Sequence, residues 1–183
     1  MIILEQRNGH WKVADRLTLW ESEGQLFTND LLEKFGLLTV QVLLESDPEL
    51  ELEKNQRFAA NINGRKRNYS KWMRRGVAET LALLGAKPEA LSTCTEGKAQ
   101  YVADTTVREL LSNADSERWA SLNDVLPLLA EAAPNVFLES IGGASEKPDE
   151  PFSGVFAEEV GGVIGRSYTA GLLWALEWKF RAN

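Results

Sequence analysis

The residues best suited to chemistry in this chain form a basic tract that runs from Arg57 to Arg75. Seven of the 20 Lys and Arg residues lie there with no acidic residue among them, although the formal net charge of the chain is -7. Such a cluster suits a phosphate or a carboxylate, because both accept charge-assisted hydrogen bonds from Arg and Lys. The members of the tract are Arg57, Arg65, Lys66, Arg67, Lys71, Arg74 and Arg75.

The strongest candidates lie at the start of a predicted helix. Ser70 is expected to cap this helix, which places Lys71 and Arg74 in its first turn, where the helix dipole disfavours each cation by about 0.3–1 kcal/mol. An anion at the free N–H groups of the helix end would offset that cost. Tyr69 and Trp72 would add stacking if the anion were a nucleic acid. The candidate anion-binding or partner-binding residues are Arg65, Lys66, Arg67, Lys71 and Arg74.

An acidic run just upstream offers a competing explanation for these cations. Its carboxylates can fold back and neutralise the basic tract within the molecule. Three interpretations stay open: internal pairing, which we favour, contact with a protein partner, and binding of a nucleic acid. The pI of about 4.9 argues against a protein devoted to nucleic acid, so any polyanion contact is expected to be local. The acidic residues are Glu45, Asp47, Glu49, Glu51 and Glu53.

Other reactive residues are too few to form a known type of catalytic or metal site. Cys94 is the only cysteine and His10 the only histidine, which excludes Cys/His zinc clusters, intrachain disulfides and two-histidine metal motifs. The glycine-rich segment 161–167 differs from a phosphate-binding loop, because its spacing is one residue short and Arg166 replaces the lysine. We therefore nominate no catalytic, cofactor-binding or metal-binding residue and expect no cofactor.

The elements that position these residues are predicted to be mainly helices. The Asn8-Gly9 pair between short apolar segments predicts a hairpin, and helical spacing of apolar residues follows it. We expect a mostly α fold, a single domain built as an irregular stack of helix pairs of the α-solenoid or HEAT-like type. The expected divisions are a small N-terminal β-hairpin over 1–14, a helical stack over 15–142, a loop over 143–167 and a terminal helix over 168–183.

Two predicted helices flank the acidic and basic runs. The first is expected to begin at Thr28 or Asn29 and to end near Asp47-Pro48, and the second to begin after Ser70 and to stop at Gly85. The apolar stripe of the first helix is Leu31, Phe35, Leu38 and Val42. The stripe of the second is Met73, Val77, Leu81 and Leu84.

Further helices are predicted after Gly85. One spans about Glu96 to Ser112, its partner starts near Ser116, and Asp124 and Pro134 open two more. Two segments with a Leu-Leu, Pro, apolar order start at Leu83 and Leu128, about 45 residues apart. This spacing falls in the range of HEAT and armadillo repeats, which is why we expect stacked helix pairs.

Four strings of the sequence resemble a known group of proteins. Residues 11–16 (WKVADR), 68–85 (NYSKWMRRGVAETLALLG), 119–134 (WASLNDVLPLLAEAAP) and 169–177 (TAGLLWALE) are similar to parts of large, poorly characterised bacterial multidomain proteins. In those proteins a nucleotide-binding region is followed by a long helical region. The resemblance implies that this chain is a helical piece of a longer protein. The ATPase residues presumed for the group have no counterpart here, so that activity is not carried over.

These observations favour a non-catalytic helical scaffold or protein-interaction module, the regulatory or sensing part of a larger bacterial protein. Its partner is expected to be a protein, either flanking domains of its own chain or another chain. The alternative is a module that binds nucleic acid or another polyanion through residues 57–75, and the third possibility is an enzyme with an unrecognised site. The single cysteine fits a reducing cytosol, and no stretch reaches the ~18 apolar residues of a membrane span, so we expect a cytoplasmic protein without membrane contact.

Overall fold

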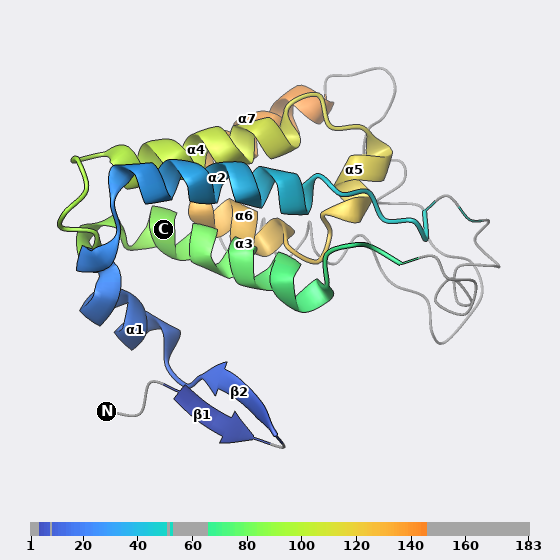
Figure 1. Ribbon diagram of the computed structural model, residues 1–183. Coiled ribbons are helices and arrows are strands. Elements are labelled where there is room, and N and C mark those ends of the chain that lie inside the picture. Colours follow the sequence, from blue (N-terminus) through green and yellow to red (C-terminus); the bar gives the residue numbers. More distant parts are fainter. Residues whose placement is uncertain (1–3, 8, 51, 53–65, 146–183) are drawn as a thin grey trace.

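The computed structural model describes residues 4–7, 9–50, 52 and 66–145, and these are mostly helical (Figure 1), which confirms the predicted class. Several sequence-based expectations concern residues outside this description. They include most of the predicted loop over 143–167, with the glycine-rich segment 161–167, and the whole terminal helix over 168–183. The tract members Arg57 and Arg65 and the acidic residues Glu51 and Glu53 also lie outside it.

Two short strands precede the helices. β1 (Leu4–Arg7) and β2 (His10–Val13) pair in antiparallel register, with the first residue of β1 opposite the last residue of β2. Gly9 between them has a φ of +80°, a left-handed conformation that glycine adopts without steric cost. Figure 1 shows the strands at one edge of the molecule, next to α1 (Arg16–Glu23). Asp15 caps α1 by accepting a hydrogen bond from the Thr18 N–H at 3.0 Å.

The helices that flank the acidic and basic runs begin at the predicted caps. α2 (Asn29–Leu43) starts after Thr28, whose hydroxyl accepts from the Leu31 N–H at 3.3 Å. α3 (Lys71–Ala86) starts after Ser70, whose hydroxyl accepts from the Met73 N–H at 3.1 Å. Both caps satisfy an N–H group that has no partner within its own helix.

The buried face of α2 differs from the predicted stripe. Leu31 and Leu38 are exposed, while Leu32 and Gly36 are buried. A Cβ on Gly36 would lie 3.1 Å from side-chain atoms of Val102 and of a threonine, both in α4 (Lys98–Leu111). The glycine therefore lets α4 approach α2 closely. As a result, the side of α2 that carries Gly36 faces the core. The full set of buried α2 residues is Leu32, Gly36, Thr39, Val40, Val42 and Leu43.

The expected stop of α3 at Gly85 is wrong, because the helix continues to Ala86 and Gly85 serves packing instead. A Cβ at this glycine would lie 1.8 Å from the backbone oxygen of Ala132, the last residue of α6 (Leu126–Ala132). Only glycine allows the two helices to approach this closely. The residue type that indicated a helix end therefore marks a helix crossing.

The remaining helices form the second half of the described chain. Pro134 opens its helix as predicted, and α6 begins after Val125, one residue later than expected from Asp124. The last of these helices runs through Gly142 and Gly143, so the loop predicted from residue 143 does not begin there. A helical glycine costs only about 1 kcal/mol, and the residues on either side of the pair pack on the core. The helices of this half are η3 (Pro88–Ala90), α4, α5 (Ser116–Ser121), α6 and α7 (Pro134–Ser145), and a further short helix, η1 (Gly24–Leu26), follows α1.

α3 contacts α2, α4 and α6, while α4 also packs on α2, α6 and α7 (Figure 1). The core has two clusters. The larger one has residues from α2 through α7 and contains Trp119, which meets Phe137 edge-on with ring centroids 6.3 Å apart. The smaller one lies near α1, where Trp20 packs with Leu84 and Leu91. Trp20 also donates its indole N–H to the Lys87 carbonyl at 2.9 Å, which fastens α1 to the end of α3.

Candidate functional site

Arg74, one of the five candidate anion-binding residues, is fully buried beneath the end of α2. Its guanidinium donates to the backbone oxygens of Val42 at 3.0 Å and Leu43 at 3.4 Å, and to those of Glu45 at 3.4 Å and Ser121 at 3.0 Å. The carbonyls of Val42, Leu43 and Ser121 belong to the ends of α2 and α5, where no intrahelical N–H is available to them, and that of Glu45 lies two residues after α2. The arginine therefore caps two helices at once.

The sequence predicts that α2 ends near Asp47-Pro48, whereas the helix ends at Leu43. This cap explains the difference. The carbonyls of Val42 and Leu43 turn toward Arg74, and the chain leaves the helix in the next residues. An arginine from another helix supplies the termination, so no residue of the α2 sequence signals it.

Arg67 is the second candidate that the fold uses internally. It forms an ion pair with Asp47, with Nη2 and Oδ2 2.9 Å apart and both side chains largely buried. The same Nη2 also donates to the Ser121 backbone oxygen at 3.1 Å and hydroxyl at 3.2 Å. Asp47 uses its other oxygen to accept from the Glu49 N–H at 3.1 Å. For this arginine, internal pairing with the acidic run is what the structure shows.

Glu45 meets the basic tract through backbone N–H groups. Its two carboxylate oxygens accept from the N–H of Asn68 and the N–H of Tyr69, the latter at 3.0 Å. Partial burial raises the pKa of Glu45, but these hydrogen bonds and the positive charge of Arg74 outweigh it, so the pKa lies below its ordinary value. Glu45 is therefore ionised at neutral pH.

Burial has the largest effect on Arg74. Loss of hydration, followed by the positive charge of Arg67, lowers the pKa of Arg74, and the negative charges of Asp124, Glu45 and Asp47 oppose this shift. A guanidinium stays protonated in proteins, so the cluster holds two positive charges. Glu45 and Asp47 supply two negative charges in return. The burial of Arg67 and Arg74 therefore depends on the presence of both carboxylates.

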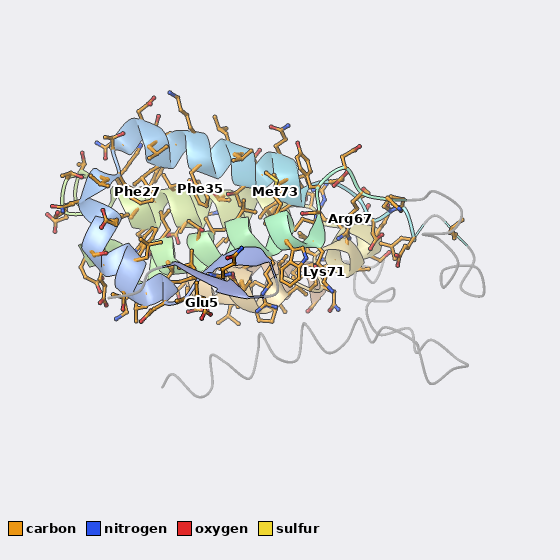
Figure 2. All side chains as sticks on the ribbon, turned by 60° about the horizontal axis from the view of Figure 1, so that its bottom comes forward. Glu5, Phe27, Phe35, Arg67, Lys71 and Met73 are labelled. Atoms are coloured by element: carbon orange, nitrogen blue, oxygen red, sulfur yellow. The ribbon has the colours of Figure 1, made fainter. Side chains whose placement is uncertain are left out.

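The two candidate lysines lie on the surface. Lys66 and Lys71 are exposed, and neither has an ionic partner among the described residues. Arg75, also in the tract, pairs with Glu79 at 2.8 Å in the same helix. Figure 2 shows Arg67 and Lys71 at the same end of α3. The structure thus divides the candidates into buried arginines and exposed lysines, while Arg65 lies outside the described residues.

The role of Ser121 was not predicted from the sequence. Its backbone oxygen accepts from both Arg67 and Arg74, and its hydroxyl donates to the Glu45 carbonyl at 3.3 Å. It follows Arg74 by 47 residues, and no local pattern marks a serine as the acceptor of two arginines. The hydrogen bond that Gln41 donates to the Tyr69 hydroxyl at 2.7 Å was not predicted either.

A second surface feature is an apolar strip along α2 and α3, which run side by side. We use the name α2–α3 strip for four exposed apolar residues of these helices, and the half-buried Phe35 and Val77 of the same helices pack against the core. Figure 2 shows Phe35 and Met73 along the boundary between the two helices. The exposed members and their exposed fractions are Leu31 (45%), Leu38 (40%), Trp72 (78%) and Met73 (39%).

Other features of the described residues offer little for catalysis. A hollow lined by polar residues between α2 and α5, including Asp115 and Arg118, has a volume of about 90 Å³, well below the several hundred Å³ of ligand pockets. No group of three or more His, Cys, Asp or Glu side chains in this part of the chain is arranged to hold a metal ion. Cys94 lies partly buried beside the smaller core, and burial raises its thiol pKa. No described helix is long and apolar enough to cross a membrane.

Comparison with protein families, curated proteins and solved structures finds no match for this chain. The site is therefore interpreted from its own geometry.

Proposed function

We propose that this chain is a non-catalytic helical scaffold or protein-interaction module, the regulatory or sensing part of a larger bacterial protein. The α2–α3 strip is the observation that carries the proposal. Trp72 is 78% exposed, and tryptophan is the residue type most enriched among binding hot spots. Large apolar side chains exposed on two neighbouring helices favour a contact site for another protein or domain.

The proposal includes an architecture of irregularly stacked helix pairs of the HEAT-like type. It is supported by the contacts of α2 with α4 and of α3 with α6, and by the two Leu-Leu, Pro segments about 45 residues apart in the sequence. The resemblance to helical regions of bacterial multidomain proteins favours the same interpretation. The partner is then a flanking domain of the parent protein or a separate chain in the cytoplasm.

Photo-crosslinking in a bacterial host tests the proposal. A photoreactive amino acid replaces Trp72 or Leu38 in the strip, and Glu109, exposed on α4, in a control. We expect a discrete protein adduct from the strip positions and none from the control. The purified partner should then bind the chain, and Trp72→Ala should weaken binding by about 30-fold, the ~2 kcal/mol of a hot spot. Equal labelling at all three positions would reject the strip as an interface.

A polyanion-binding module is the second candidate. The exposed Lys66 and Lys71 beside the exposed Trp72 favour it, because lysines contact phosphates and an aromatic ring can stack on a base. Filter binding to mixed DNA and RNA over a salt series separates it from the first proposal. Steep loss of affinity with salt, and loss of binding in Lys66→Ala/Lys71→Ala, would support it. Absence of binding at low salt would end it.

A further inference from the structure

The segment before α3 holds a carboxylate in the way proteins hold bound anions. Two consecutive N–H groups, of Asn68 and Tyr69, donate to the two oxygens of one carboxylate, that of Glu45. Successive N–H groups that point to one side form a common receptor for phosphate and carboxylate groups. Asn68 is exposed and Glu45 only half-buried, so this contact is open to solvent.

Unused positive charge lies next to this contact in the sequence. Lys66 precedes Asn68 by two residues, and Lys71 follows Tyr69 by two. Both lysines are exposed without an ionic partner among the described residues. Glu45 contributes a single negative charge, and no other carboxylate of the described residues pairs with these two lysines, although the net charge of the chain is -7.

We propose that residues 66–71 form a binding site for a phosphate dianion, and that the Glu45 carboxylate occupies this site as an intramolecular competitor. A phosphate dianion carries nearly twice the charge of a carboxylate and has three acceptor oxygens. It can therefore accept from the N–H groups of Asn68 and Tyr69 and still pair with Lys66 and Lys71. Arg67 and Arg74 do not move, because their hydrogen bonds to Asp47 and Ser121 hold the segment in place.

Glu45 sets the affinity of this site. A group tethered near its site competes at an effective concentration in the millimolar range, so a free anion must displace it. Removing the charge of Glu45 should make the N–H groups of Asn68 and Tyr69 available to a free anion. Removing a distant carboxylate should only change the net charge. Glu109 is a matched control for the second effect, since it is exposed on α4.

The test is a titration of the full chain with inorganic phosphate, followed through the NMR signals of the Asn68 and Tyr69 amides. We expect Glu45→Gln to bind phosphate at least tenfold more tightly than the wild type or Glu109→Gln. Replacing Lys66 and Lys71 by Gln in the Glu45→Gln background should remove at least tenfold of that affinity. Acetate should bind more weakly than phosphate, and glycerol phosphate shows whether a monoester is accepted as well as free phosphate.

Equal phosphate affinity of the wild type and Glu45→Gln would overturn the proposal, as would affinity that does not depend on Lys66 and Lys71. If Glu45→Gln does not fold, the wild type decides the question. High phosphate should then shift the Asn68 and Tyr69 amide signals, while chloride at the same ionic strength should not. Identical shifts in both salts would show screening of charge without a site.

Discussion

Arg67 and Arg74 donate to the same acceptor, the backbone oxygen of Ser121, at 3.1 and 3.0 Å. Two like charges this close would repel, and they are kept together by carbonyl groups at the ends of α2 and α5 and by the carboxylates of Glu45 and Asp47. The cluster therefore joins three parts of the chain that are distant in sequence. The basic tract owes part of its composition to this structural role.

The buried arginine should be essential for stability. Arg74→Ala leaves the carbonyls of Val42 and Leu43 without their side-chain donor, and the Ser121 carbonyl keeps only its bond from Arg67. It also leaves the charges of Glu45 and Asp47 less compensated. We expect it to lower the free energy of unfolding by about 3–5 kcal/mol. Urea denaturation followed by circular dichroism measures the loss.

Arg75→Ala is the matched control for Arg74→Ala. Arg75 is the next residue of the same helix, but it is exposed and pairs with Glu79 only one turn away. Such surface pairs contribute about 0.2–1 kcal/mol. Similar losses for the two variants would contradict the assignment of Arg74 as a cap for α2 and α5.

The two glycines of α3 should respond to alanine in opposite directions. At Gly85 a Cβ would lie 1.8 Å from the Ala132 carbonyl oxygen, whereas at Gly76 it would meet no atom within 4 Å. Gly85→Ala must push α6 away from α3, and we expect a loss of about 3 kcal/mol. Gly76→Ala should raise stability by about 0.5–1 kcal/mol, because alanine favours the helix.

Thermal unfolding of both variants checks this prediction. A small and equal effect of the two substitutions would mean that α3 and α6 do not approach at Gly85 as described. A loss at Gly76 would instead show that this face of α3 is covered in solution.

Local signals predicted the starts of helices well. Ser70 and Thr28 accept from N–H groups three residues ahead, and Pro134 opens a helix, so each effect is contained within one turn of sequence. The predicted pairing of the acidic run with the basic tract holds for Arg67 and Asp47, which lie 20 residues apart.

Features that depend on the approach of a distant element were not predictable in this way. Gly85 has the residue type of a helix stop, and only the position of Ala132 reveals its role. Leu31 and Leu38 fit an apolar stripe as well as Leu32 does, and the contact of Gly36 with α4 decides which of them is buried. Likewise, the complete burial of Arg74 could be predicted only from the position of the end of α5.

An unsatisfied hydroxyl in α2 offers a route to higher stability. Thr39 is fully buried, and its Oγ1 has no hydrogen-bond partner in the described part of the chain. Thr39→Val keeps the shape of the side chain and removes a polar atom whose burial costs about 1–3 kcal/mol. We expect a gain of about 1 kcal/mol in the free energy of unfolding, measured with urea.

Thr80→Val is the control for Thr39→Val. The Thr80 hydroxyl donates to the Gly76 carbonyl at 2.9 Å, so its removal should leave stability unchanged or lower it by up to about 1 kcal/mol. A loss of stability in Thr39→Val would indicate that this hydroxyl has a partner in solution.

Two glutamates should give opposite pH dependences. The pKa of Glu45 in the folded chain is below its ordinary value of 4.5, so its charge stabilises the fold above that pH, and the contribution is lost as the pH falls through the folded pKa. Burial raises the pKa of Glu131 above 4.5, so its charge opposes folding at neutral pH, and this cost disappears below pH 4.5.

The sign of each effect is visible in the neutral variants. At pH 7, Glu45→Gln should be less stable than the wild type and Glu131→Gln more stable. Both differences should shrink as the pH falls, that of Glu131→Gln as the pH drops from its raised pKa to 4.5 and that of Glu45→Gln only below 4.5. Urea unfolding at a series of pH values separates the two, because the charge of Glu45 is held by hydrogen bonds whereas that of Glu131 is only desolvated. A pH-independent difference in either variant would assign its effect to packing and not to charge.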